Sequence, residues 1–340
     1  MELRKSDTSE QKALLETSSP RSENRTIAGM LPQSDNSSPG LLEQPTFLMN
    51  CPFSLHTRHA NNAWMHDIDD DKRKIDRNKA MAQFANLYAF LTSAGIVFLL
   101  PTPRNCELQD LVYTANLGVV LEHIPERDLV VLSNFTSEPR VGETEVGRSF
   151  FASMGYRALL APYKFEGDAE LKHLHDNIYI GGYGLRSDPK VYDWMQREFN
   201  MTVIKVREVD PYLYHLDCSV FPITPENTLV CTKMFSNAEI AKIEKYTNVI
   251  DVSVDAAYSG ICNSIRYHNS ILNASHIVTL KACTDDYRYE LKKNRELEDI
   301  AIELGLEVSY FNLSEYQKSG ALLSCMVMHL NRRSYAFSLI

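Results

Sequence analysis

Residues 177–209 read NIYIGGYGLRSDPKVYDWMQREFNMTVIKVREV, and this one stretch carries the patterns of three successive elements. Its two ends, 177–184 and 201–209, are short runs rich in β-branched and aromatic residues, which are typical of strands. The residues between them, 188–199, carry apolar side chains at helical spacing. The stretch therefore predicts a strand–helix–strand unit, which is the building block of α/β proteins.

The same alternation of short strands and helices extends in both directions, from Pro45 to the end of the chain. No linker interrupts it, so we expect one α/β or α+β domain over residues 46–340. The units are similar in size, which suits a structural repeat, although the sequence itself shows none. Further strands are predicted at 47–51, 96–100, 129–134 and 228–233, and further helices at 71–95, 142–154, 237–246, 255–268 and 287–304.

Residues 1–45 have a different composition, rich in Ser, Asn, Pro and Glu and poor in aromatic residues. Such a segment cannot bury enough apolar surface to offset the entropy lost on ordering. It predicts a disordered extension, with one short helix around residues 9–18, for which a regulatory role is one interpretation.

The composition also excludes several classes of partner. The chain has 340 residues and a formal net charge of −9, without a basic stripe, which argues against nucleic acid. Seven cysteines, an odd number without a CxxC pair, indicate a reducing compartment. The N-terminus lacks the apolar region of a secretory signal, and no apolar run is long enough to span a bilayer. We expect a cytoplasmic protein without membrane partners, either a monomer or a homo-oligomer.

Gly-rich and His-containing stretches do not indicate a cofactor or a metal. Residues 181–186, GGYGLR, depart from GxGxxG followed by a helix, and the sequence lacks GxxxxGK[ST]. The histidines at 56, 59 and 66 lie in a polar loop without Cys or carboxylate neighbours at ligand spacing. We therefore predict neither a cofactor nor a metal.

Two polar stretches are more informative. In 212–223, YLYHLDCSVFPI, His215 and Asp217 are two residues apart among apolar neighbours, which predicts a strand with both side chains on one face. In 163–174, YKFEGDAELKHL, Glu166 and Asp168 have the same spacing. Because buried carboxylates are costly unless paired, these pairs indicate a cationic ligand or an internal ion-pair network. The residues alone leave both open.

A late cysteine lies in 314–333, SEYQKSGALLSCMVMHLNRR, between a loop with Ser and Gly and an apolar run. Alone, Cys325 reads as a small buried hydrophobe. Together with a histidine and carboxylates it suggests a reaction. A guanidinium presents a planar fork of N–H groups, so carboxylates can hold it while a thiolate attacks its carbon and a histidine transfers protons.

The combination of FEGD, YHLD and a late Ser-Gly…Cys loop resembles the guanidine-modifying enzymes, namely arginine deiminases, dimethylarginine dimethylaminohydrolases and amidinotransferases. The resemblance covers about residues 46–335, with the motifs in the family's order. It implies the pentein fold, a five-bladed α/β propeller of repeated ββαβ-like units around a pseudo-fivefold axis.

The resemblance also implies roles for individual residues. Cys325 would be the nucleophile, and His215 the general acid/base. Asp217 would grip the guanidinium, and Arg186, in YGLRSD at 183–188, would bind a substrate α-carboxylate.

The remaining carboxylate comes from the family's Glu-Gly-(Gly)-Asp motif, which here reads Glu166-Gly167-Asp168 with one glycine fewer. We assign Glu166 the catalytic role and Asp168 a substrate-binding role. Because of the missing glycine, the two assignments could be exchanged.

Two further segments resemble the cyanobacterial-type arginine dihydrolases, which release ornithine, carbon dioxide and ammonia. They are HANNAWM at 59–65 and VYTANLG at 112–118. The matched residues, Asn62 and Asn116, would hold the neutral ureido group of a citrulline-like intermediate. The alternative for Asn116 is a turn residue before Gly118, between two strand pieces predicted within 111–121.

These observations predict a hydrolase acting on the guanidinium of arginine or an arginine derivative, with a small guanidino molecule as its only expected partner. An amidinotransferase and a dimethylarginine dimethylaminohydrolase are the enzymatic alternatives. A pentein-fold binding protein without activity is the non-enzymatic one, because a fold alone does not fix a function.

Overall fold

The structure is a computed structural model, and it describes residues 38–335 except 105–106. Residues 1–37 of the predicted extension, including its helix at 9–18, therefore lie outside the described residues. The described part begins with a 3-10 helix, Pro39–Leu41, in which Pro39 and Gly40 are buried. The division of the chain at residue 45 stays a prediction.

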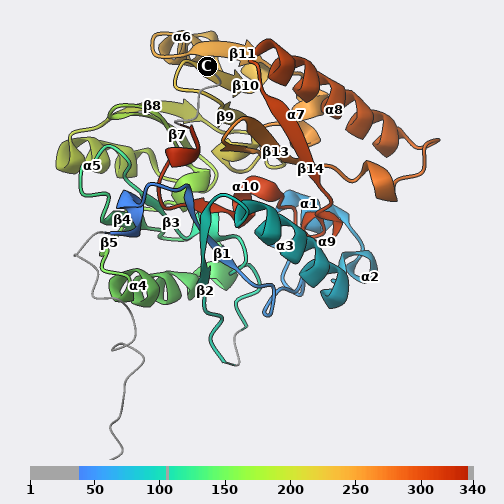
Figure 1. Cartoon of the computed structure of the whole chain (residues 1–340), viewed down its shortest axis with the longest axis horizontal. Coiled ribbons are helices and arrows are strands. Elements are labelled where there is room, and N and C mark those ends of the chain that lie inside the picture. Colours follow the sequence, from blue (N-terminus) through green and yellow to red (C-terminus); the bar gives the residue numbers. More distant parts are fainter. Residues whose placement is uncertain (1–37, 105–106, 336–340) are drawn as a thin grey trace, which may run out of the picture. The chain divides into compact units, whose positions relative to one another are not determined.

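Strands and helices alternate along the described chain, which confirms the α/β class (Figure 1). The strands are β1 (Thr46–Asn50), β2 (Ile96–Leu100), β3 (Gly118–Val120), β4 (Leu129–Leu132), β5 (Arg157–Leu160), β6 (Leu171–His175), β7 (Ile178–Tyr183), β8 (Thr202–Arg207), β9 (Val220–Pro222), β10 (Asn227–Val230), β11 (Asn248–Asp251), β12 (Ile265–Tyr267), β13 (Ser270–Ala274), β14 (Glu307–Phe311) and β15 (Met328–His329). The α-helices are α1 (Ala63–Asp67), α2 (Asp70–Arg73), α3 (Arg77–Leu91), α4 (Glu143–Ser153), α5 (Pro189–Phe199), α6 (Asn237–Ile243), α7 (Val254–Tyr258), α8 (Asp285–Glu303), α9 (Ser314–Gln317) and α10 (Leu323–Met326).

The strands form five separate three-stranded sheets with one recurring pattern. Their orders are β15-β1-β2, β3-β4-β5, β6-β7-β8, β9-β10-β11 and β12-β13-β14. In every sheet the middle strand pairs antiparallel with one neighbour and parallel with the other. A helix connects each parallel pair, so the expected structural repeat is present as a ββαβ unit. The first sheet differs, because its antiparallel partner β15 comes from the end of the described chain.

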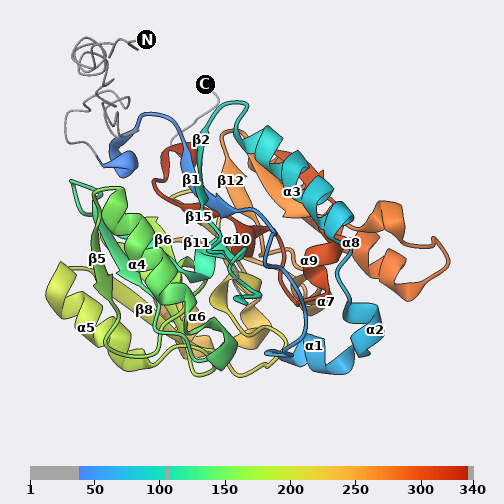
Figure 2. The ribbon, with the colours of Figure 1, turned by 90° about the horizontal axis from the view of Figure 1, so that it is seen from below.

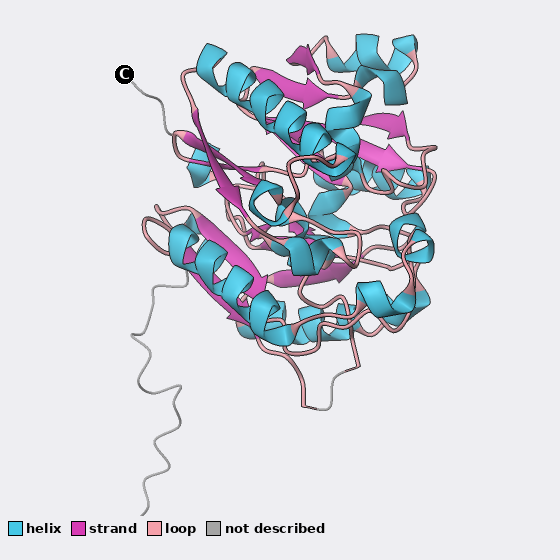
Figure 3. Ribbon diagram, turned by 90° about the vertical axis from the view of Figure 1, so that its right-hand side faces the viewer, coloured by secondary structure: helices cyan, strands magenta, loops and turns pink. Residues whose placement is uncertain are grey.

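The unit predicted from 177–209 is confirmed as β7, α5 and β8. Asp188 caps α5 by accepting a hydrogen bond from the Lys190 N–H, and Asn200 ends it in the left-handed conformation at φ 50°. Val191, Tyr192 and Met195 of α5 are buried in one hydrophobic cluster with residues of this sheet. The helix therefore covers its own sheet, as α3, α4 and α8 do in theirs (Figures 2 and 3).

The predicted elements at 111–121 and 255–268 differ from the structure. The segment 111–121 has a 3-10 helix, Thr114–Asn116, in place of its first strand piece. The predicted helix 255–268 is only α7, because Gly260 turns the chain at φ 82° and β12 follows. Among residues 38–104 and 107–335, no helix is long and apolar enough to cross a membrane.

Candidate active site

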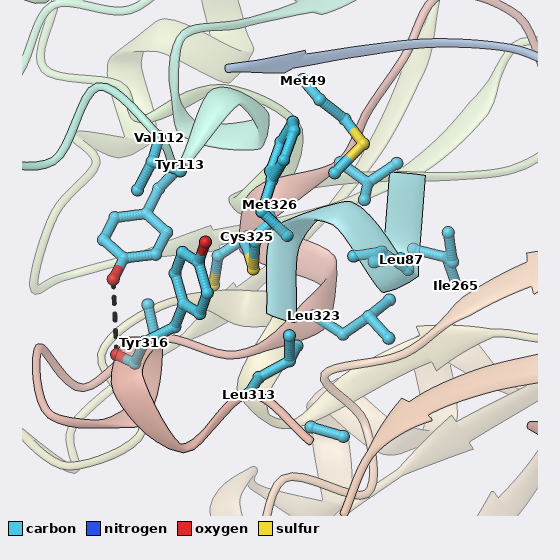
Figure 4. Packing of buried hydrophobic residues seen from close by; sticks show 14 of the residues in the cluster. Met49, Leu87, Val112, Tyr113, Ile265, Leu313, Tyr316, Leu323, Cys325 and Met326 are labelled. Atoms are coloured by element: carbon cyan, nitrogen blue, oxygen red, sulfur yellow. Dashed lines mark hydrogen bonds between the residues drawn. The ribbon is translucent and has the colours of Figure 1, made fainter. Parts of the chain in front are cut away.

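Cys325 lies in α10 and is buried, with 3% of its surface exposed. Figure 4 shows its side chain close to Tyr113 and Met326 within a hydrophobic cluster. Its sulfur also has polar partners. Asn263 Nδ2 donates to Sγ at 3.3 Å, and the thiol donates to Asp217 Oδ2 at 3.6 Å. The cysteine is therefore a buried thiol in contact with a carboxylate.

Asp217 lies in a 3-10 helix, Leu216–Cys218, so the strand predicted here is wrong. His215 still has extended backbone angles, but the chain then turns, and Leu216 packs into a separate hydrophobic cluster. Ser324 Oγ donates a second hydrogen bond to Asp217 Oδ2 at 2.6 Å. The short helix thus fixes Asp217 against α10 and its cysteine.

His215 pairs with Glu166, and both side chains are buried. The distance between His215 Nε2 and Glu166 Oε2 is 2.7 Å, and Asn116 Nδ2 lies 3.4 Å from His215 Nδ1. If the amide donates to Nδ1, Nε2 carries the hydrogen and donates to the carboxylate. Gly167, at φ 71°, brings these residues together, because a Cβ there would lie 2.5 Å from the carbonyl oxygen of Ala115.

One small cavity brings most of the predicted site residues together. It is lined by Asn62, Asn116, Arg186, His215 and Cys325, among others. Its free volume of about 10 Å³ accommodates one water-sized molecule, so a larger ligand requires the walls to move.

Arg186 and Asn62 are both anchored at the edge of this cavity. Arg186 Nη2 donates to the Asn61 carbonyl oxygen at 2.6 Å, and its guanidinium lies 5.0 Å from the ring centre of Tyr214. Asn62 caps α1 by accepting from the Met65 N–H at 3.0 Å, and its amide donates to the Ser319 carbonyl oxygen at 2.9 Å. Its amide therefore already has structural partners.

Three predicted site residues do not line this cavity, namely Glu166, Asp217 and Asp168. Glu166 and Asp217 are hydrogen-bonded to the lining residues His215 and Cys325, whereas Asp168 has other partners. Its carboxylate accepts from Arg332 Nη2 at 2.8 Å and lies 3.3 Å from His329 Nδ1, at a different cavity. The 3-10 helix Gly167–Ala169 turns the chain directly after Glu166, so the two carboxylates diverge. The geometry therefore selects Glu166, and not Asp168, as the partner of His215.

The family described as N,N dimethylarginine dimethylhydrolase, eukaryotic, matches residues 52–332 of the chain. The chain belongs to this family. It is therefore a member of the guanidine-modifying superfamily and a C–N hydrolase of guanidino groups, as the sequence predicted.

Relatives of this dimethylhydrolase-family protein carry two kinds of name. The bifunctional arginine dihydrolase/ornithine cyclodeaminase AgrE of Nostoc sp. is 27% identical over 290 residues, which cover 84% of the chain and 37% of AgrE. The N(G),N(G)-dimethylarginine dimethylaminohydrolase of Mycobacterium tuberculosis is 25% identical over 287 residues, which cover 84% of the chain and 85% of that protein. A solved structure of the N-terminal domain of ArgZ, a cyanobacterial arginine dihydrolase, has a TM-score of 0.72 at 23% identity and covers 84% of the chain and 98% of that domain. This likeness supports the fold.

Sequence reasoning missed Asp110, which also lines the cavity of this dimethylhydrolase-family protein. Asn61 Nδ2 donates to its Oδ2 at 2.5 Å, and the residue is buried. Burial raises the pKa of Asp110, while Arg140 and Arg186 act in the opposite direction. Asp110 stands directly before the segment LVYTAN, which begins with apolar residues. This position beside a motif was the one signal in the sequence that could have indicated the residue.

Burial leaves the thiol and the imidazole of the site neutral at rest. Burial and the Asp217 carboxylate raise the pKa of Cys325 to about 12. Burial lowers the pKa of His215, although Glu166 acts in the opposite direction. Burial alone would raise the pKa of Glu166, but the hydrogen bond and charge of His215 lower it to about 2. A cation placed beside these carboxylates would favour the Cys325 thiolate.

Alkylation of Cys325 in the free protein is expected to be slow near pH 7 and to accelerate about tenfold per pH unit, because only the thiolate reacts. The measurement is iodoacetamide labelling followed by peptide mass spectrometry. Cys283 is exposed and provides an internal control for accessibility. A labelling rate at Cys325 that levels off near neutral pH would contradict the raised pKa.

Proposed function

We propose that the chain hydrolyses the guanidinium of arginine or an arginine derivative through a covalent thiouronium intermediate on Cys325. The reaction would release ammonia or an amine and leave citrulline or ornithine. The observation that carries the proposal is the contact between the Cys325 thiol and Asp217, at the cavity that also holds His215 paired with Glu166. The family match supports hydrolysis of a small guanidino molecule.

The proposal includes the arrangement of the five ββαβ units as blades of a pentein propeller around a pseudo-fivefold axis. The same pairing pattern in all five sheets supports it. In such an arrangement the loops that carry Glu166, His215 and Cys325 come from different blades and meet near the axis, which agrees with their shared hydrogen bonds.

In the first half of the proposed reaction, Asp217 and Glu166 hold the substrate guanidinium. With the cation bound, the Cys325 thiol transfers its proton to His215, and the resulting thiolate attacks the guanidinium carbon. The tetrahedral adduct then expels ammonia or an amine. His215, as the imidazolium, donates the proton that this leaving group needs.

In the second half, the neutral His215 takes a proton from a water molecule, which attacks the thiouronium carbon. The carbon–sulfur bond breaks, Cys325 leaves as the thiolate, and citrulline is released. A second hydrolysis, on the neutral ureido group, would give ornithine, carbon dioxide and another ammonia. Asn116, whose amide already faces His215, supports this second step.

Groups for the amino-acid end of the substrate are also present. Arg186 would bind the α-carboxylate, because its planar fork matches carboxylate oxygens. Asp110, a buried acid at the same cavity, would complement the α-ammonium group. These two residues favour a free α-amino acid as the substrate.

Transfer of the amidino group to an amine and hydrolysis of dimethylarginine are the alternatives. The match to the dimethylarginine dimethylhydrolase family favours the second of these. A silent binding protein is disfavoured by the retained thiol, imidazole and carboxylates. The cytoplasmic location remains a prediction from the cysteine usage, and the oligomeric state remains open.

Product analysis with L-arginine and with dimethylarginine tests the proposal. Ornithine with two equivalents of ammonia would identify a dihydrolase, whereas citrulline with one equivalent of ammonia would identify a deiminase. Dimethylamine from dimethylarginine would identify a dimethylaminohydrolase. Product formed only after an amine is added would replace hydrolysis by transfer, and the absence of product throughout would overturn the proposal.

A further inference from the structure

Two buried glutamates that the proposed mechanism does not use lie beneath the site. Glu170 directly precedes β6 and Glu208 directly follows β8, the two strands that flank β7. Their exposed fractions are 0% and 7%. Both carboxyl groups face Gly182 of β7, where a Cβ would lie 2.7 Å from Glu170 Oε2 and 2.9 Å from the Glu208 carboxyl carbon. The missing side chain at Gly182 leaves room for the pair.

Apart from the partner carboxyl group itself, no group in the described part of the chain donates a hydrogen bond to the four oxygens of this pair. The nearby Tyr192 hydroxyl donates to the main-chain carbonyl oxygens of Glu170 and Gly182 instead. Two ionised carboxylates in a dry site would repel each other and would both lose their hydration. A hydrogen bond between the two carboxyl groups removes this conflict, and it requires a proton.

The surrounding charges also favour retention of a proton. Besides burial, the negative charges of Glu166 and Asp217 raise the pKa values of both carboxyl groups, while the charge of Arg186 lowers the pKa of Glu208. Burial, followed by the charge of Glu208, raises the pKa of Glu170 well above its usual range. Burial raises the pKa of Glu208 to about 8, while the hydrogen bond from Glu170 acts in the opposite direction. Groups of three or more His, Cys, Asp and Glu that could hold a metal ion are absent from residues 38–104 and 107–335.

The pair is connected to the catalytic segment through Leu216. The Cβ of Leu216 lies 2.9 Å from the position that a Cβ on Gly182 would occupy, so it is close to both carboxyl groups. In the sequence, Leu216 stands between His215 and Asp217. Repulsion within the pair would therefore push on the residue that sets the spacing of these two side chains.

We infer that Glu170 and Glu208 form a proton-sharing carboxyl pair that positions His215 and Asp217 and limits the negative charge beside Glu166. The catalytic part of this inference rests on the proposed function, whereas the existence of the proton does not. Both residues act as positioning residues, since they reach the catalytic segment through Leu216.

Infrared spectroscopy of the wild-type protein tests the proton directly. A C=O stretching band of protonated carboxyl groups is expected at neutral pH. It should weaken as pH rises through about 8, where Glu208 ionises, while the contribution of Glu170 persists to higher pH. The part of the band that comes from the pair should disappear in Glu170→Gln/Glu208→Gln, while the part from Glu143, whose pKa burial raises to about 7, remains in both proteins. The part from the pair should persist in the matched control Glu290→Gln, which replaces a buried glutamate paired with Lys293 at 3.0 Å. Absence of the part from the pair, as for an ionised pair neutralised by a bound cation, would overturn the inference.

The pH dependence of unfolding gives a second measurement that is independent of activity. Because the folded state retains a proton that the unfolded state releases above about pH 4.5, stability falls as pH rises toward about 8. Glu208→Gln removes this pH dependence, because an amide does not ionise. The ratio of the unfolding equilibrium constant of wild type to that of the variant should therefore rise by up to about tenfold per pH unit in this window. If the ratio of the two unfolding equilibrium constants does not change with pH, the inference is contradicted.

The positioning role is tested by the kcat–pH profile of Glu208→Gln, whose amide can donate to Glu170 without ionising. We expect wild-type kcat to fall above about pH 8 and kcat of the variant to persist. If wild type and Glu208→Gln have identical kcat–pH profiles, the pair does not position the catalytic residues. The infrared result then still decides whether the pair holds a proton. If no guanidino substrate is turned over at all, the proposed function fails, and the infrared and unfolding measurements still decide on the pair.

Discussion

Cys325→Ser is expected to lower kcat on the preferred guanidino substrate by about 10³-fold or more, because a serine hydroxyl at its ordinary pKa is a weak nucleophile. The side chain is buried against Asp217, so the hydroxyl would donate to this carboxylate and remain protonated. Substrate binding should persist, since Asp217, Glu166 and Arg186 are unchanged. Steady-state kinetics and equilibrium dialysis with the same substrate measure the two effects separately.

The matched control is Cys283→Ser, the same substitution at an exposed position. Its kcat and KM should equal those of wild type. In the wild-type protein, rapid acid quenching followed by mass spectrometry should find the intermediate on the peptide that contains Cys325. Retention of more than a few per cent of kcat in Cys325→Ser would exclude this residue as the nucleophile.

Glu166→Gln is expected to lower kcat by about 10² to 10⁴-fold, which is the usual contribution of general acid–base catalysis. With a pKa of about 2, Glu166 is ionised throughout the neutral range and stabilises the protonated His215 across 2.7 Å. The amide keeps the shape of the side chain but loses the charge. His215 would then be a poorer proton donor to the leaving group, and the loss should be greatest at alkaline pH, where fewer imidazoles are protonated.

Asp168→Asn is the matched comparison, because it changes another buried carboxylate two residues away to its amide. Asp168 pairs with Arg332 at 2.8 Å, so its loss leaves a buried guanidinium uncompensated and should destabilise the protein by about 3–5 kcal/mol. At a temperature where the variant is folded, its kcat should stay within a few-fold of wild type. Thermal unfolding and kinetics at reduced temperature separate the effects, and the opposite pattern would return the catalytic role to Asp168.

Local signals in the sequence were sufficient for much of the fold. The unit at 177–209 could be predicted because strand-forming residues, helical spacing and turn residues agree within it. The stretch around His215 could not, because alternation over three residues fits both a strand and the start of a 3-10 helix. The early end of α7 depends on Gly260 at φ 82°, which the helical pattern across 255–268 concealed.

For the site, the motif resemblance pointed to Cys325 and His215, but it could not distinguish Glu166 from Asp168. That choice depends on Gly167, whose positive φ fits the chain against the carbonyl oxygen of Ala115. The proximity of Glu170 to Glu208 was equally hidden, since the pairing of β6 and β8 with β7 brings them together across a long sequence separation. Contacts between residues that are distant in the sequence depend on the tertiary structure, so the sequence around each residue does not predict them.

The pairing of β1 with β15 has a consequence for how the protein is made. Phe47 pairs with His329, so the strand that completes the first sheet is translated long after β1. At about 5–20 residues per second, β1 waits on the ribosome for tens of seconds with one edge unpaired. The thiol of Cys325 is also absent during this time. Under the proposed mechanism, a nascent chain is therefore inactive until Cys325 has been translated. Chains released before β15 would expose a strand edge that chaperones and proteases can recognise.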